Sequence, residues 1–217
     1  LRINQRGDVF HCHLEYCTRK WRAGAGIIGV HDQARDRMNA KELPSGRVYS
    51  WSIKYDPIGN GRRGLVTATL DGDQAVCELS PDHKEDGAEF NRCGVLNVNK
   101  QFDGGGALWL DDVIINGERE DFSSDPQWDA DGNRRTYETR NVRPRFDFGY
   151  SRTHHAGGQA LGELGGLFFR GDCRYGERLA AYGDRLSPLT LDRPLRASGK
   201  GCLRRGVSDS TTLLGFY

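Results

Sequence analysis

The 217-residue chain has few long apolar runs, a single methionine and little imbalance of charge. No stretch approaches the roughly 18 consecutive apolar residues of a membrane-spanning helix, so the sequence predicts no transmembrane span. Lysine and arginine together number 31, against 30 aspartates and glutamates. Without a basic excess, there is no overall field to attract nucleic acid or an anionic membrane, and neither partner is expected.

The chain also lacks any Cys-x-x-Cys pair, although it contains six cysteines. This spacing argues against a zinc ribbon and a thioredoxin-like motif. An even number of cysteines in a glycine-rich chain suits an oxidised, exported protein, and free buried thiols are the alternative. No signal peptide is visible and the chain starts at Leu1 rather than Met, so we interpret it as a mature or excised fragment. From the cysteine count we predict an extracytoplasmic or secreted location.

Short alternating segments are what the sequence does contain. In residues 46–72, the side chains of Tyr49, Trp51, Ile53 and Tyr55 fall on one face of a strand and polar residues fall on the other. A turn rich in Pro, Gly and Asn follows, and a second alternating strand returns. This stretch predicts a half-buried hairpin at the centre of the fold.

Similar short strands recur along the chain without regular helices between them, which is typical of a β-sandwich. Residues 33–42 contain helix-forming side chains and predict a turn or two of helix, or a loop. We predict an all-β, jelly-roll-like sandwich of antiparallel sheets. Its expected parts are a sandwich core region (1–118), a long loop or connection (119–162), and strands that complete the sandwich or begin a second repeat (163–217).

Several of these segments carry a family resemblance. The series W-S-I-K-Y-D-P at 51–57, L-D-G at 70–72, F-N-R-C-G at 90–94 and D-D-V at 111–113 resembles the concanavalin A-like lectin/glucanase superfamily, which includes laminin-G-like domains. The similarity covers residues 46–116. It implies a concanavalin A-like fold and a tendency to bind carbohydrate, and its motifs mark positions of the scaffold rather than an active site.

His11, His13 and Glu15 are candidate site residues because alternate residues of a strand project from the same face. Two imidazoles and a carboxylate in a row suit a metal such as zinc or iron, or a general acid and base in a sugar-binding groove. A polar, solvent-facing side of a strand is the other interpretation.

Trp21 and Trp128 are candidate platforms for sugar rings, because both lie in polar, turn-like surroundings. Trp51 and Trp109 fall in strongly apolar strands and are expected in the core.

Asp129, Asp131 and Asn133 offer closely spaced oxygen atoms beside a turn-forming glycine, which suits calcium. The glutamate that completes an EF-hand loop is missing, since Arg140 occupies that position. A turn without metal is the alternative interpretation.

The glucanase signature E-x-D-x-E is absent, as are G-x-S-x-G, S-x-x-K and H-E-x-x-H. We therefore expect an extracytoplasmic, non-catalytic module that binds carbohydrate or a surface and belongs to a larger protein. A polysaccharide hydrolase or lyase that uses His11, His13 and Glu15 is the first alternative. The second is a structural or assembly module whose exposed edge strands pair with other protein chains.

Overall fold

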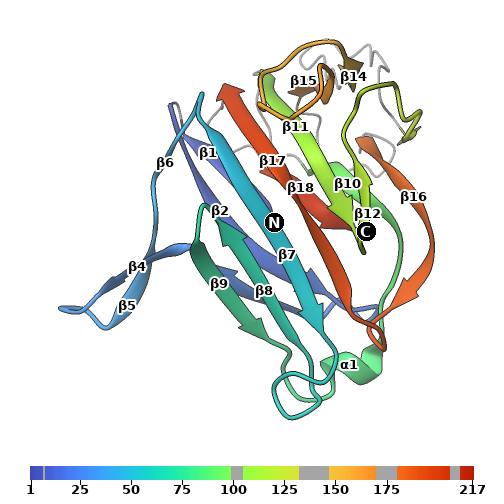
Figure 1. Ribbon diagram of the computed structural model, residues 1–217. Coiled ribbons are helices and arrows are strands. Elements are labelled where there is room, and N and C mark those ends of the chain that lie inside the picture. The colour runs from blue at the N-terminus through green and yellow to red at the C-terminus, as the bar shows by residue number, and fades with distance from the viewer. Residues whose placement is uncertain (7, 99–104, 132–146, 170–179, 206–210) are drawn as a thin grey trace, which may run out of the picture.

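The computed structural model describes residues 1–6, 8–98, 105–131, 147–169, 180–205 and 211–217. Within these residues, almost all regular structure is β-strand, arranged as two large antiparallel sheets packed together (Figure 1). The predicted all-β sandwich is confirmed, whereas the jelly-roll order of its strands stays a prediction.

The first sheet is eight-stranded and is formed from both ends and the middle of the chain. In spatial order its strands are β13 (Asp129–Asp131), β16 (Ala180–Thr190), β10 (Glu89–Val98), β18 (Thr211–Phe216), β1 (Arg2–Arg6), β2 (Val9–Cys17) and β3 (Ala23–Ile27), with β6 (Leu43–Pro44) paired to β2.

The second sheet is also eight-stranded and contains the predicted central hairpin. Its order is β14 (Asp147–Ser151), β15 (Glu163–Phe169), β11 (Gly105–Ile115), β17 (Leu195–Arg205), β7 (Val48–Asp56), β8 (Leu65–Leu70) and β9 (Asp73–Glu78), with β12 (Glu118–Glu120) paired to β11.

A separate hairpin of β4 (Gly29–Asp32) and β5 (Arg37–Ala40) projects from one side of the sandwich (Figure 1). The expectation of helix or loop over 33–42 was wrong for residues 37–40. Pairing with β4 supplies backbone hydrogen bonds in register, and this outweighs the weak helix preference of the side chains. The described residues contain one short helix, α1 (His83–Asp86), in the polar run after β9.

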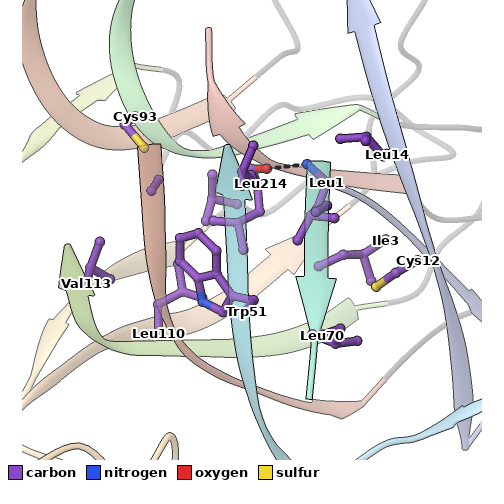
Figure 2. Packing of buried hydrophobic residues seen from close by; sticks show 14 of the residues in the cluster. Leu1, Ile3, Cys12, Leu14, Trp51, Leu70, Cys93, Leu110, Val113 and Leu214 are labelled. Carbon is purple, nitrogen blue, oxygen red and sulfur yellow. Dashed lines mark hydrogen bonds between the residues drawn. The ribbon is translucent and has the colours of Figure 1, made fainter. Parts of the chain in front are cut away.

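The core lies between the sheets and follows the alternation read from the sequence. On β7, Tyr49, Trp51, Ile53 and Tyr55 are all buried, and the residues between them are not. Figure 2 shows Trp51 surrounded by side chains such as Leu110 of the same sheet and Leu214 of the opposite sheet. The two layers therefore share one apolar interior.

The segments expected as connection and completion are part of these sheets. Residues 119–162 contribute β13 to the first sheet and β14 to the second, so they are not a single long loop; residues 132–146 lie outside the described part. Within 163–217, β17 lies between β7 and β11, and β18 lies between β10 and β1.

One edge of the sandwich is closed by a close approach of the two sheets. A β-carbon on Gly26 of β3 would lie 2.7 Å from the carbonyl oxygen of Val76 in β9. Only glycine permits this contact without a backbone shift. The edge strands of the two layers therefore meet at this point.

Candidate functional site

The row predicted on β2 lies on the outer face of the first sheet. Phe10, Cys12 and Leu14 are buried, whereas His11 and His13 are half-buried and Glu15 is exposed. The alternation places the two imidazoles and the carboxylate side by side along the strand. The structure thus brings together the three residues that the spacing selected.

Arg2 of the neighbouring strand binds this row. Its Nη1 lies 2.8 Å from Oε1 of Glu15, and its Nε donates to Oδ1 of Asn4 at 3.1 Å. Partial burial, and next the positive charge of Arg2, lower the pKa of His13. His13 is therefore a neutral imidazole at neutral pH, able to donate one hydrogen bond and accept another.

The described residues include no group of three or more His, Cys, Asp or Glu side chains that could hold a metal ion. Nε2 of His11 is buried and has no hydrogen-bond partner among the described residues. The Glu15 carboxylate is engaged by Arg2. This arrangement supports a strip of hydrogen-bonding groups better than a zinc or iron centre.

Small side chains lie beside this strip on β3. Ala25 is paired with Glu15 and Ala23 with Cys17, and both alanines are exposed. Because their side chains are short, the taller side chains of β2 stand above them. We call this area, formed by the outward residues of β2 and β3, the β2–β3 trough.

Trp21 lies at one end of the trough, in the turn between β2 and β3. Its side chain is 89% exposed, and its φ of 61° is in the left-handed region. The Thr18 N–H donates to the carbonyl oxygen of Arg22 at 2.8 Å, and the Trp21 N–H donates to that of Thr18 at 2.9 Å. These bonds fix the turn and direct the indole to the solvent.

Asp86 of α1 anchors the same turn from below. Its carboxylate is almost fully buried and accepts hydrogen bonds from Nε of Arg22 and from Oγ1 of Thr18, the latter at 3.1 Å. The hydrogen bond from Arg22 is the main cause that holds the pKa of Asp86 well below its usual range. The contacts of Asp86 with Thr18 and Arg22 thus fix the turn that carries the exposed Trp21 side chain.

A cavity of about 620 Å³ opens between the sheets next to this turn. Its interior is mainly apolar, with Tyr16, Ile53, Tyr55, Leu195 and Phe216 among its walls. Arg2, Glu15 and Trp21 lie at its outer rim. Sequence reasoning did not find this cavity, because its walls come from distant parts of the chain.

Trp128 has a different environment from Trp21. Its ring centroid is 5.5 Å from that of Phe122 and 6.5 Å from that of Tyr182, and the side chain is half-buried against the core. The neighbouring rings occupy its surfaces, so the structure supports a packing role rather than a sugar platform.

The predicted calcium ligands are also in a different setting. Oδ2 of Asp129 accepts from Nε and Nη2 of Arg92 at 3.0 and 2.5 Å and lies 3.3 Å from Nη2 of Arg185. Two guanidinium groups therefore bind this carboxylate. The side chain of Asp131 and all of Asn133 lie outside the described part of the chain.

A second polar cluster, on the outer face of the second sheet, was missed by sequence reasoning. Glu163 is fully buried and accepts the backbone N–H groups of His155 and Ala156 at 2.7 and 2.6 Å. Asp111, also fully buried, accepts the Gly158 N–H at 2.8 Å, and burial raises its pKa.

These two carboxylates hold the loop of residues 152–162 against the sheet, and the His155 ring packs on Trp109 with centroids 4.5 Å apart. A carboxylate within an otherwise apolar strand was the one visible signal in the sequence. The carboxylate oxygens are used by loop N–H groups, which indicates an anchoring role.

No protein-family model matches the chain, and no curated protein matches it in sequence. The resemblance to concanavalin A-like proteins therefore stays a prediction. Among the described residues, no helix is long and apolar enough to cross a membrane. The described cysteines, Cys12, Cys17, Cys77, Cys93 and Cys202, are all free thiols, so none of them supports the disulfide argument for export.

Proposed function

We propose that this chain is a non-catalytic carbohydrate-binding module whose ligand lies along the β2–β3 trough. The exposure of Trp21 supports this most directly: an indole that is 89% exposed is held in a fixed turn beside a polar strip. A large apolar side chain in this position loses the benefit of burial, and a ligand that covers it restores that benefit.

The chemistry of the trough suits a sugar. A pyranose ring has an apolar face, which stacks on an aromatic ring, and an edge of hydroxyl groups. The Glu15 carboxylate, the Arg2 guanidinium and the neutral His13 imidazole offer acceptors and donors along the same surface. The ligand is therefore expected to be a neutral polysaccharide that places one ring on Trp21.

The enzymatic alternative would use His11, His13 and Glu15 as acid and base. Arg2 engages the Glu15 carboxylate, and no feature of the row favours bond cleavage over binding. Replacing all three by alanine provides a direct comparison: a polysaccharide-degrading activity that the triple variant loses would establish the alternative.

The binding proposal is tested by electrophoresis of the folded protein through gels that contain single soluble polysaccharides, together with a glycan array. Trp21→Asn removes the ring and retains a residue that tolerates the positive φ. We expect at least about a tenfold loss of affinity, because an exposed aromatic anchor contributes a large share of binding energy.

Ile58→Asn is the matched control, because Ile58 is 67% exposed and lies in the loop after β7. This variant should bind as the wild type does. Failure of every polysaccharide to bind, or equal affinity of wild type and Trp21→Asn, would refute the proposal.

A further inference from the structure

Two positively charged side chains lie opposite each other on the outer face of the second sheet. Lys54 of β7 is paired directly with Arg196 of β17, and both residues are exposed. The two strands lie side by side in the middle of this sheet (Figure 1). Like charges that are directly opposite on one face of an antiparallel pair destabilise a sheet. The Lys54–Arg196 pair therefore lowers stability unless an anion lies close to both side chains.

The described part of the chain supplies no such anion. Neither the Lys54 side chain nor the Arg196 side chain forms an ion pair or a hydrogen bond with a described residue; the Arg196 backbone N–H donates to Oδ1 of Asn116 at 2.9 Å. Asp56 lies at the next outward position of β7, but its Oδ1 accepts the Ile58 N–H at 3.0 Å. The two positive charges are thus uncompensated among the residues that the structure describes.

A cation further along β17 has a different environment. Nζ of Lys200 lies 3.0 Å from Oδ2 of Asp112, and Nη2 of Arg119 lies 2.7 Å from Oδ1 of the same carboxylate. Lys200 is four residues from Arg196 and therefore lies on the same face of the strand. On this face, the sheet neutralises one group of cations internally and leaves the Lys54–Arg196 pair without a carboxylate.

A like-charged pair in the first sheet shows how this chain compensates such repulsion. Arg92 of β10 is paired directly with Arg185 of β16. One oxygen of Asp129, Oδ2, lies 2.5 Å from Nη2 of Arg92 and 3.3 Å from Nη2 of Arg185. A single oxyanion therefore serves two opposed cations. The Lys54–Arg196 pair presents the same arrangement of cations, and an oxyanion from outside the chain would complete it in the same way.

Hydroxyl groups lie beside the two cations on the same face. Thr67 of β8 is paired with Lys54, and Ser198 of β17 is at the next outward position after Arg196. Residues that are directly opposite have β-carbons about 4.5–5.5 Å apart, so these hydroxyls are within reach of a group held by the cations. An ammonium, a guanidinium and two hydroxyls are thus available as donors on one small area of the sheet.

We propose that the Lys54–Arg196 pair binds a tetrahedral oxyanion, the sulfate or phosphate monoester group of an exogenous ligand. Such a group has three terminal oxygens, and the two cations with the Thr67 and Ser198 hydroxyls can donate to all three. A carboxylate has two oxygens and would leave donors unused. The site lies on the opposite sheet from the β2–β3 trough, so it does not depend on the sugar proposal.

The experiment is an NMR titration of the isotope-labelled full chain with sodium sulfate, inorganic phosphate and sodium acetate. Sodium chloride keeps the ionic strength constant, so that general screening does not change during the titration. We expect saturable shifts in the side-chain signals of Lys54 and Arg196 with sulfate and with phosphate, and about threefold or more weaker binding of acetate. Phenyl sulfate and phenyl phosphate, compared in the same way, identify which monoester binds more tightly.

The variants Lys54→Gln and Arg196→Gln each remove one cation from the pair. We expect either change to weaken sulfate binding about fivefold, as the loss of one exposed ionic contact. Arg37→Gln is the matched control, because Arg37 is also exposed and lies on the separate β4–β5 hairpin. It removes the same charge from the protein and should bind sulfate as wild type does.

Three results would overturn the proposal: no saturable shift at Lys54 and Arg196 with any of these sulfates or phosphates, equal affinity of wild type and the glutamine variants, or an equal loss in Arg37→Gln. The last would show that only net charge matters. If one glutamine variant does not fold, the other provides the comparison. Trp21→Asn should leave sulfate binding unchanged, so that the sugar proposal and this one succeed or fail separately.

Discussion

The α-amino group of Leu1 lies in the core, where it donates a hydrogen bond to the carbonyl oxygen of Leu214 (Figure 2). Burial disfavours the ammonium form and lowers the pKa of this group from 8.0 to about 6. An acetyl group on the nitrogen would remove the charge and keep an N–H for Leu214. We predict that the 217-residue polypeptide, made to begin at Leu1, is less stable than its acetylated form below pH 8.

The sign of the effect follows from proton linkage. Between the folded and unfolded pKa values, the unfolded chain binds the proton and the folded chain does not, so stability increases as the pH rises. Above pH 8 the amine is neutral in both states and does not lower the stability of the fold. The stability is lost as the pH falls through about 6, where the buried amine must also take up a proton. The difference, 8.0 minus about 6, is about two pKa units and corresponds to about 2.7 kcal/mol.

Urea unfolding of both forms over a series of pH values between about 5 and about 9 measures this difference. All other titratable groups are common to both forms, so the quantity to compare is the free energy of unfolding of the acetylated form minus that of the form with the free amine. We expect this difference to decline to near zero above pH 8. A difference that does not change with pH would refute the reasoning that the amine is buried.

Three further predictions concern the anchoring carboxylates and the thiols. Replacing Glu163 by Gln weakens the hydrogen bonds that residue 163 accepts from the N–H groups of His155 and Ala156, and should lower the free energy of unfolding by about 1.5–3 kcal/mol. An unchanged urea midpoint would contradict the anchoring role. Asp86 has a lowered pKa in the folded state, so it contributes stability that is present above its unfolded pKa and lost as the pH falls. Asp86→Asn should therefore lose less stability on acidification than wild type, and equal acid dependence in thermal unfolding would argue against this. Maleimide should label Cys17 in the native protein, whereas burial raises the pKa of Cys12 and Cys93 to about 12 and should leave both unlabelled until unfolding; mass spectrometry of the digested protein distinguishes these outcomes.

Local patterning was sufficient to predict β7 and the face on which the histidines lie. Tyr49, Trp51 and Ile53 alternate with polar residues, and the strand buries them as that alternation requires. His11 and His13 share a face for the same reason. A period of two is a property of consecutive residues, so it is visible before any distant segment is placed.

The two tryptophans show that local patterning does not predict which of two similar side chains is buried. Trp21 and Trp128 have similar polar neighbours in the sequence, yet Trp21 is 89% exposed and Trp128 packs on Phe122 and Tyr182. Tyr182 is far from Trp128 along the chain, and β13 and β16 bring them together. The sequence had no means of distinguishing the two environments.

Chain patterning thus determined the class of fold, the burial of each strand and the polar row on β2. The tertiary structure alone decided the rest: the anchoring of a loop by Asp111 and Glu163, and the apolar cavity between the sheets. Alternation depends on the geometry of one strand. A site, in contrast, depends on which strands become neighbours and where each one ends, and contacts between residues far apart in the sequence set both.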